Sequence, residues 1–273
     1  MTVIRIMGRL LAAVALATLA ACGSDIQTTS GRAYLDAYET PTGADATSGE
    51  SETIDAKVRR VAAVEPTLRF PSRIGLARIE NGELSGMSSA EAAAWMAGAE
   101  RLGPAFGEFV PLSRLVAEMV TNPTNEAAGQ SLVPASRLHR TMEKIRLGAA
   151  RQHLDVVLVY EVYGRSNQSG NPLSVLNLTI IGAFLLPGET IDAVGFASAL
   201  LLDVRNGYPY GTARHVVDHG AITPSVGSRN ERQQLMRSAM TEAAVGLVPE
   251  VETMFRRLHV ALSQLDAPTR TQE

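Results

Sequence analysis

The spacing of apolar and polar residues predicts a domain that mixes strands with helices. Ser72–Ile79 is rich in β-branched residues and is followed by Asn81-Gly82, which indicates a strand that ends in a tight turn. Asp155–Tyr163 is apolar at both odd and even positions, as in a central strand covered on both faces. Phe109–Leu112 predicts a further short strand.

Helix signals lie between and after these strands. The Ser88-Ser89-Ala90-Glu91 run is a capping-box pattern, which should open an alanine-rich helix ending near Leu102, before Gly103-Pro104. The other expected helices are Ser113–Met119, a helix introduced by Ser131 and Pro134 that reaches about His153, and a long helix opened by the capping box Ser228-Arg229-Asn230-Glu231. Pro249 should kink or restart this last helix.

A run of three antiparallel strands is expected in the second half of the chain. The strands are Leu173–Leu186, Ile191–Val204 and Tyr208–His219, joined by the turns 187–190 and 205–207. Alternation in the middle strand separates two sets of side chains. The large set is Val194, Phe196, Leu200, Leu202 and Val204, and the small set is Ala193, Gly195, Ala197 and Ala199. A helix should pack closely on the small face. The predicted fold class is therefore α+β, with a mixed, largely antiparallel sheet and helices packed on it.

The first residues have the pattern of an export signal. Arg5 and Arg9 precede the apolar run Leu10–Ala21, which is well short of the ~20 residues that a membrane-spanning helix needs. The run ends in Leu19-Ala20-Ala21-Cys22, which resembles the bacterial lipobox. The alternative is an ordinary cleaved signal in which the cysteine is incidental.

The lipobox resemblance implies that Cys22 carries acyl chains, palmitate among them, and is the first residue of the mature protein. Cys22 is the only cysteine, so its acylation would leave no thiol for a disulfide, a zinc site or a nucleophile. Gly23 and Ser24 follow it, where inner-membrane lipoproteins tend to have an aspartate. The resemblance thus favours a protein held by its acyl chains in the outer membrane and facing the periplasm.

The expected organisation has four parts. Residues 1–21 are the signal peptide, and residues 22–57 are the lipidated cysteine and a flexible tether. Residues 58–265 form one globular domain, and residues 266–273 form a polar tail. The island Ala33–Tyr38 within the tether is either plain linker or a segment that docks onto the domain.

Composition and motifs argue against several activities. The net charge of −3 favours neither nucleic acid nor an anionic membrane surface as a partner. Lys57 and Lys144 are the only lysines and neither follows a glycine-rich turn, so a nucleotide site is not expected. Hydrophobic residues make up 45% of the chain, enough for a substantial core. No cofactor is expected.

His215 and His219, with Asp218 between them, are the strongest metal candidates. In a strand, four residues separate the two histidines by about 13 Å, which is too far for one zinc ion. No metal site is therefore expected. No Gly-x-Ser-x-Gly motif occurs, so a hydrolase would need a cleft that gathers His215, Asp203 and a serine. The sequence predicts a protein that is not an enzyme.

Five further residues are candidate site residues. Tyr160, Tyr163, Tyr208 and Tyr210 could form an interaction surface where the central strand meets the last hairpin, or they could be core residues with hydroxyls at the rim. Glu161 lies inside an apolar strand. It either marks a site with a raised pKa or lies at the solvent end of the strand or beside an arginine.

Two segments carry a family resemblance. Ile180–Thr190, followed by Ala199–Val204, resembles the rhombotail-type lipoproteins, and more loosely the envelope lipoproteins with a CsgG-like or TolB N-terminal-like α+β domain. The resemblance covers about Arg137 to Thr212. It departs from the rhombotail pattern after Asn206-Gly207, where Tyr208–Gly211 replaces a basic and aromatic run. The resemblance implies no catalytic residues.

Two functions are consistent with these features. The first is a lipid-anchored, non-enzymatic protein that binds or scaffolds another protein of the envelope. The second is a CsgG-like subunit of an oligomeric secretion pore, in which the hairpin Leu173–Val204 would enter the outer membrane, since about 9 to 11 strand residues span a bilayer.

Overall fold

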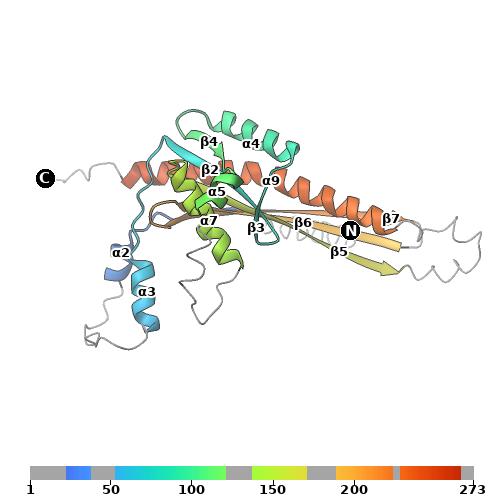
Figure 1. Ribbon diagram of the computed structural model, residues 1–273, viewed down its shortest axis with the longest axis horizontal. Helices are drawn as coiled ribbons and strands as arrows, with labels where there is room; N and C mark the ends of the chain where they lie inside the picture. The colour runs from blue at the N-terminus through green and yellow to red at the C-terminus, as the bar shows by residue number, and fades with distance from the viewer. Residues whose placement is uncertain (1–22, 38–52, 121–136, 171–188, 224–227, 266–273) are drawn as a thin grey trace, which may run out of the picture.

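The computed structural model describes residues 23–37, 53–120, 137–170, 189–223 and 228–265 (Figure 1). The strands are β1 (Gly23–Ile26), β2 (Ser72–Glu80), β3 (Glu83–Ser85), β4 (Gly107–Pro111), β5 (Val156–Gly170), β6 (Glu189–Asp203) and β7 (Pro209–Thr223). The helices are α2 (Gly31–Asp36), α3 (Ile54–Ala62), α4 (Ser89–Leu102), α5 (Arg114–Val120), α7 (Arg137–Arg151) and α9 (Ser228–Leu265).

The strands form one seven-stranded sheet in the order β1-β7-β6-β5-β2-β3, with β4 beside β2. The pairs β1·β7, β7·β6, β6·β5 and β2·β3 are antiparallel, whereas β2 runs parallel to both β5 and β4. The sheet is therefore mixed and largely antiparallel, and helices pack against it. This confirms the predicted fold class.

The long helix α9 packs on β1, β7, β6 and β5 on one face of the sheet, and α4 lies beside it (Figure 1). It packs on the small face of β6, where a Cβ added at Gly195 would overlap the backbone carbonyl of Ala239 in α9. The main core lies in this layer and includes Tyr160, Leu201 and Phe255. The predicted helix on the small face of β6 is confirmed, because only small residues let the helix backbone come this close.

The opposite face is covered at one end only. There α7 places Ile145 and Ala149 on Val157 and Ala77, in a second core cluster. The strand β2 accompanies β5 only as far as Glu161, and β1 accompanies β7 only over residues 211–214. The outer half of the β5-β6-β7 meander therefore extends past its neighbours (Figure 1), and no described helix packs on its second face.

The local helix signals correspond closely to the structure. Ser88 caps α4, and its hydroxyl accepts a hydrogen bond from the Glu91 backbone N–H. Gly103 ends the helix with a φ of 80° and a ψ of 176°, a backbone conformation that only glycine adopts readily. Pro249 was expected to kink or restart the last helix. The restart alternative is wrong, because α9 continues through this residue, and the kink alternative stays a prediction.

The N-terminal boundary of the domain differs from the prediction. Residues 23–26 form β1 at the edge of the sheet, so the described fold begins at Gly23 and not near Val58. The helix α2 docks on the domain: the Tyr208 hydroxyl donates to the Thr29 carbonyl, and Gly31 lies against the backbone of Ala62 in α3. These docking contacts come from residues 29–31, just before the Ala33–Tyr38 island, and the described residues of the island are mostly exposed. Residues 38–52 lie outside the description.

The neighbours of β6 also differ from the prediction. Its register pairs Glu189–Asp203 with β5 on one side and β7 on the other. The neighbour expected on the first side was Leu173–Leu186, all of which lies in the stretch 171–188 outside the described residues. Glu189 and Thr190 belong to β6 and are not turn residues. The strand β5 is longer than predicted, because its pairing with β6 continues to Gly170.

Candidate functional site

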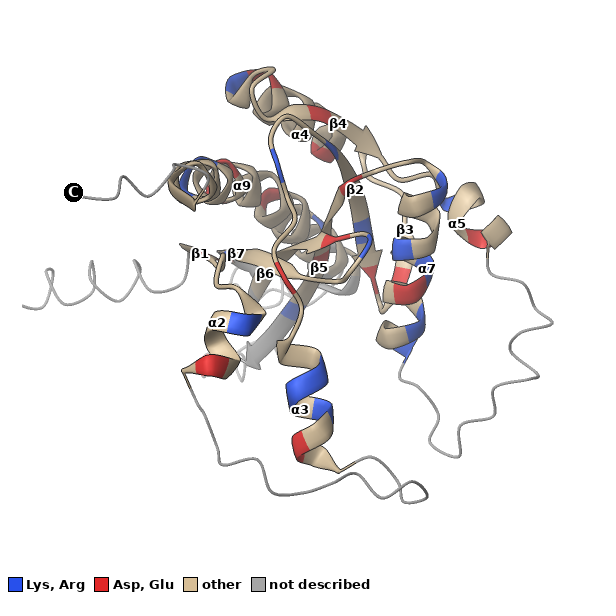
Figure 2. Ribbon diagram, turned by 90° about the vertical axis from the view of Figure 1, so that its left-hand side faces the viewer, with Lys and Arg blue, Asp and Glu red and all other residues tan. Residues whose placement is uncertain are grey.

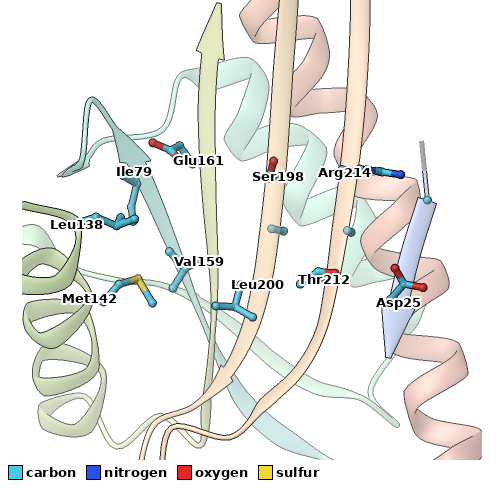
Figure 3. A pocket seen from close by; sticks show the side chains of 13 residues that line it. Asp25, Ile79, Leu138, Met142, Val159, Glu161, Ser198, Leu200, Thr212 and Arg214 are labelled. Atoms are coloured by element: carbon cyan, nitrogen blue, oxygen red, sulfur yellow. The ribbon is translucent and has the colours of Figure 1, made fainter. Parts of the chain in front are cut away.

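A groove of about 440 Å³ crosses the open face of the sheet between α7 and β1 (Figure 3). Val159 of β5 and Leu200 of β6 lie along its floor, and Leu138 and Met142 of α7 form one wall. Asp25 of β1 lies at the other end. The groove forms because α7 covers only part of this face of the sheet. Its side chains rise above the neighbouring strands that the helix does not cover.

The residues of the groove form two rows that run across the strands. One row pairs Glu161 with Ser198, Ser198 with Arg214, and Arg214 with Gly23. The adjacent row pairs Val159 with Leu200, Leu200 with Thr212, and Thr212 with Asp25. All of these side chains point away from α9, because residues two apart in a strand share a face.

The row that contains Glu161, Ser198 and Arg214 is polar, and its two opposite charges lie on different strands. Glu161 on β5 and Arg214 on β7 are separated by Ser198 on β6, which places their strands about 10 Å apart. Asp25 adds a second carboxylate at the β1 end. Such a surface can contact apolar side chains with its floor and hydrogen-bond or pair with charged groups at its rim.

A stacked aromatic pair adjoins the groove on the same open face. The rings of Tyr163 and Phe196 are 4.8 Å apart with an angle of 9° between their planes, and Phe196 is paired with Val216 across β7. Tyr163 is 42% exposed. Exposed aromatic side chains next to a groove are frequent anchors for a protein partner.

The other three tyrosines of the candidate surface are in the core. Tyr160, Tyr208 and Tyr210 are almost fully buried and belong to the cluster on the α9 side of the sheet. The interaction surface expected from the four tyrosines is therefore wrong for these three. Tyr163 differs because it lies three positions after Tyr160, an odd offset that places it on the opposite face of β5.

Asp203 and Tyr210 form a buried polar cluster at the turn between β6 and β7. The Tyr210 hydroxyl donates to Asp203 Oδ2 over 3.1 Å and accepts from the backbone N–H groups of Thr67 and Leu68, each at 2.7 Å. Asp203 Oδ2 also accepts from the Thr67 hydroxyl, at 2.9 Å. Burial raises the pKa of Tyr210 above its ordinary value. These contacts fix the segment before β2 on the domain.

A second buried cluster joins α4 to the sheet. The Tyr160 hydroxyl donates to Glu91 Oε2 over 2.8 Å. Arg78 Nε lies 2.9 Å from the same oxygen, although its N–H is not directed at it. The pKa of Tyr160 is raised strongly, mainly by burial and next by the nearby charge of Glu91. Since the cluster is enclosed between α4 and the sheet, it holds the two together and offers no access to a substrate.

The residues considered for a metal site or a hydrolase site do not come together in the described structure. Among the described residues, no group of three or more histidine, cysteine or acidic side chains could hold a metal ion. His219 lies 2.8 Å from Glu242 of α9, and His215 packs beside Gly246 of the same helix. His215 is paired with Ala197 of β6, and Asp203 lies six positions further along that strand. About 20 Å of strand therefore separates Asp203 from the position of His215.

The predicted lipobox residues Leu19, Ala20, Ala21 and Cys22 lie outside the described part of the chain. Gly23 follows Cys22 directly, and it lines the groove as the first residue of β1. Glu161, which was a candidate on sequence grounds, is a groove residue and is partly exposed. None of the helices in the described ranges has the length and apolar character to cross a membrane.

Sequence reasoning missed Asp25, Arg214 and Thr212. The pattern Gly-Ser-Asp-Ile gives no strand signal, so Asp25 was assigned to the tether. Arg214 and Thr212 were recognised only as strand residues. Alternation along Tyr208–His219 could have placed these two on the face opposite His215. Their proximity to residues 23–25 depends on a pairing between segments about 190 positions apart.

Comparisons with known proteins give weak similarities. No family model matches the chain, and no curated protein sequence does. A PelC dodecamer structure from Paraburkholderia phytofirmans matches with 12% identity and a TM-score of 0.29, covering 68% of this chain and 86% of that chain. Lipoprotein GNA1162 from Neisseria meningitidis matches with 15% identity and a TM-score of 0.29, covering 63% and 99%. The LpoB C-terminal domain from Salmonella enterica matches with 16% identity and a TM-score of 0.26, covering 54% and 82%.

Proposed function

We propose that the chain is a non-enzymatic lipoprotein of the bacterial outer membrane that faces the periplasm and binds another envelope protein in the groove. Residues 1–21 are its export signal, Leu19–Cys22 is its lipobox, and acyl chains on Cys22 attach it to the bilayer. The observation that carries the proposal is the position of Gly23. The residue that follows the acylated cysteine is itself a groove residue.

The anchor supplies attachment, and the groove supplies recognition. Each methylene of an acyl chain buried in the bilayer contributes about 0.8 kcal/mol, so two or three chains hold the protein durably. Because β1 starts at Gly23, the groove is held close to the membrane surface. A partner segment with apolar side chains would lie on Val159 and Leu200, and its polar groups would meet Glu161 and Arg214.

The anchor is tested by metabolic labelling with palmitate in a Gram-negative host. The wild-type chain should incorporate label and fractionate with outer membranes, and Cys22→Ser should lose both properties. Ser24→Ala is the matched control, because it changes a neighbouring small residue and leaves the cysteine. Label that persists in Cys22→Ser would contradict the proposal, as would full membrane fractionation of that variant.

The groove is tested by placing a photo-crosslinking amino acid at Ser198 in the anchored protein in cells. Ser198 is exposed at the centre of the polar row. Val260, which is 56% exposed on the opposite layer in α9, is the control position. A discrete adduct should form at Ser198 and not at Val260, and Leu200→Arg should abolish it. Equal adducts at the two positions, or none at Ser198, would refute binding in the groove.

The second candidate is a CsgG-like pore subunit, in which the hairpin Leu173–Val204 enters the membrane. The packing of α9 on β6 argues against it, because Ala193, Gly195 and Ala197 are buried under this helix. A lipid-facing β6 would have to lose α9 along that face. Oligomers that resist detergent on a gel would favour the pore, and a monomer in the Cys22→Ser protein without residues 1–21 would favour the binding function.

A further inference from the structure

The helix α3 (Ile54–Ala62) has an apolar stripe that nothing in the described structure covers. Ile54, Val58 and Val61 are 72%, 51% and 68% exposed, and their spacing places them on one side of the helix. No residue of α3 is buried. A nine-residue helix is marginal in water without packing. The stripe therefore has the properties of a surface that another molecule or a membrane covers.

The position of α3 is fixed although its stripe is uncovered. At its C-terminal end the chain is tied down through Glu65, whose side chain accepts from the Ser30 hydroxyl at 3.0 Å and from the Arg32 N–H at 2.8 Å. Asn206 donates to the Glu65 carbonyl at 2.8 Å. The contact of Gly31 with Ala62 then holds α3 against α2. The helix is therefore presented in a defined place, on the side of the sheet away from α4 and α9 (Figure 2).

The charge of α3 indicates which surface it meets. Its nine residues include three basic side chains, Lys57, Arg59 and Arg60, and one acidic side chain, Asp55. Basic residues around an apolar stripe are the composition of helices that lie in the interface of a bilayer containing anionic lipids. A second copy of the chain, with a net charge of only −3, offers a much lower density of negative charge than an anionic lipid surface.

The fold also keeps α3 near the proposed anchor. The strand β1 begins at Gly23 and spans about 10 Å, and α2 begins at Gly31, five residues after β1 ends. Since α2 carries α3, the helix lies within reach of the bilayer to which Cys22 would be attached.

We propose that α3 binds the surface of an anionic bilayer through Ile54, Val58 and Val61 and so orients the domain on the membrane. This inference rests on the proposed envelope location, but the binding itself needs no acyl chain. With one contact at the N-terminus and a second at α3, the domain would have a fixed orientation on the membrane. A single anchor would leave it free to turn.

The test uses the chain from residue 22 onward with Cys22→Ser, which keeps every described helix and strand and carries no lipid. Flotation is measured with vesicles of phosphatidylethanolamine and phosphatidylglycerol, and with vesicles of phosphatidylcholine alone. The protein should bind the anionic vesicles, bind the neutral ones at least about tenfold less, and be released by salt.

Three variants distinguish the effect of the apolar stripe on binding from the effects of added charge and of helix stability. Val58→Asp should lower binding about tenfold or more, whereas Ala56→Asp adds the same charge on the other side of the helix and should lower it much less. Val58→Ala favours the helix but removes apolar area, so it should still weaken binding severalfold.

Four results would overturn the proposal. They are no binding to either vesicle, equal loss in Val58→Asp and Ala56→Asp, stronger binding by Val58→Ala, or a dimer that Val58→Asp dissociates while vesicle binding stays unchanged. Palmitate labelling of Cys22 tests the anchor separately. Failure of the anchor and failure of α3 therefore give different results.

Discussion

Gly195 in β6 lies against the backbone carbonyl of Ala239 in α9, so closely that a side chain at position 195 would overlap it. The contact brings the helix onto the sheet at the centre of the meander. Because it joins two backbones, it cannot be relieved by a change of rotamer. The spacing of α9 over β6 and β5 depends on this glycine.

We expect Gly195→Ala to destabilise the domain by about 1–3 kcal/mol, because the added methyl group must push α9 away from the sheet. The measurement is the midpoint of urea unfolding. Gly86→Ala is the matched control, since a Cβ at Gly86 would meet no atom within 4 Å. Equal midpoints for the two variants would contradict the close approach.

Tyr210→Phe should cost about 3 kcal/mol of unfolding free energy. The substitution removes one hydroxyl that satisfies the Thr67 N–H, the Leu68 N–H and one oxygen of Asp203, and buried polar groups left without partners are costly. Tyr163→Phe makes the same chemical change in a half-exposed ring and should have little effect. A loss below about 1 kcal/mol in Tyr210→Phe would show that the cluster is not a stabilising unit.

Glu91→Gln tests the second buried cluster. The variant keeps the shape of the side chain but removes the charge beside Arg78, which is itself largely buried. Arg78 keeps its ion pair with Glu80 at 2.7 Å, so we expect a loss of about 1–2 kcal/mol in unfolding free energy. Glu108→Gln is the control, because its ion pair with Arg73 is exposed on both sides. If the two variants unfold at the same denaturant concentration, the buried pair contributes nothing.

Stability should fall at alkaline pH. Burial raises the pKa of Tyr160, Tyr208 and Tyr210, so these hydroxyls stay protonated in the folded chain while the unfolded chain loses their protons above about pH 10. Each raised pKa therefore stabilises the fold fully below that pH and progressively less above it. The loss is up to about 1.4 kcal/mol per pH unit for each tyrosine that remains protonated.

The measurement combines urea unfolding with tyrosinate absorbance at pH values from about 9 to 11. Absorbance from the buried rings should appear only together with unfolding, and Tyr160→Phe should show a shallower fall in stability. Complete ionisation of the tyrosines in a folded domain would rule out this linkage.

The parts of the fold that could be predicted from sequence are those set by neighbouring residues. Ser88 and Glu91 lie three residues apart and define the start of α4 on their own. The small residues at 193, 195, 197 and 199 specify a close helix because alternation assigns them to one face. The same alternation places Tyr163 and Tyr160 on opposite faces of β5, so the sequence does not support one surface that contains both.

The parts that could not be predicted depend on contacts between distant residues. The strand β1 has four residues and gains its structure from pairing with β7, almost two hundred positions later. The groove needs Asp25, Glu161 and Arg214 together, and only the register of four strands brings them to one face. No local pattern carries that information.

The start of β1 at Gly23 limits how far the protein can act. A lipoprotein with a long linker can sweep a wide volume of the periplasm. With the proposed acylation of Cys22, the cysteine would lie one residue before β1 and would leave no slack between bilayer and domain. A partner that binds in the groove would then have to come to the membrane surface, within one domain diameter. Components that stay further out would be beyond its reach.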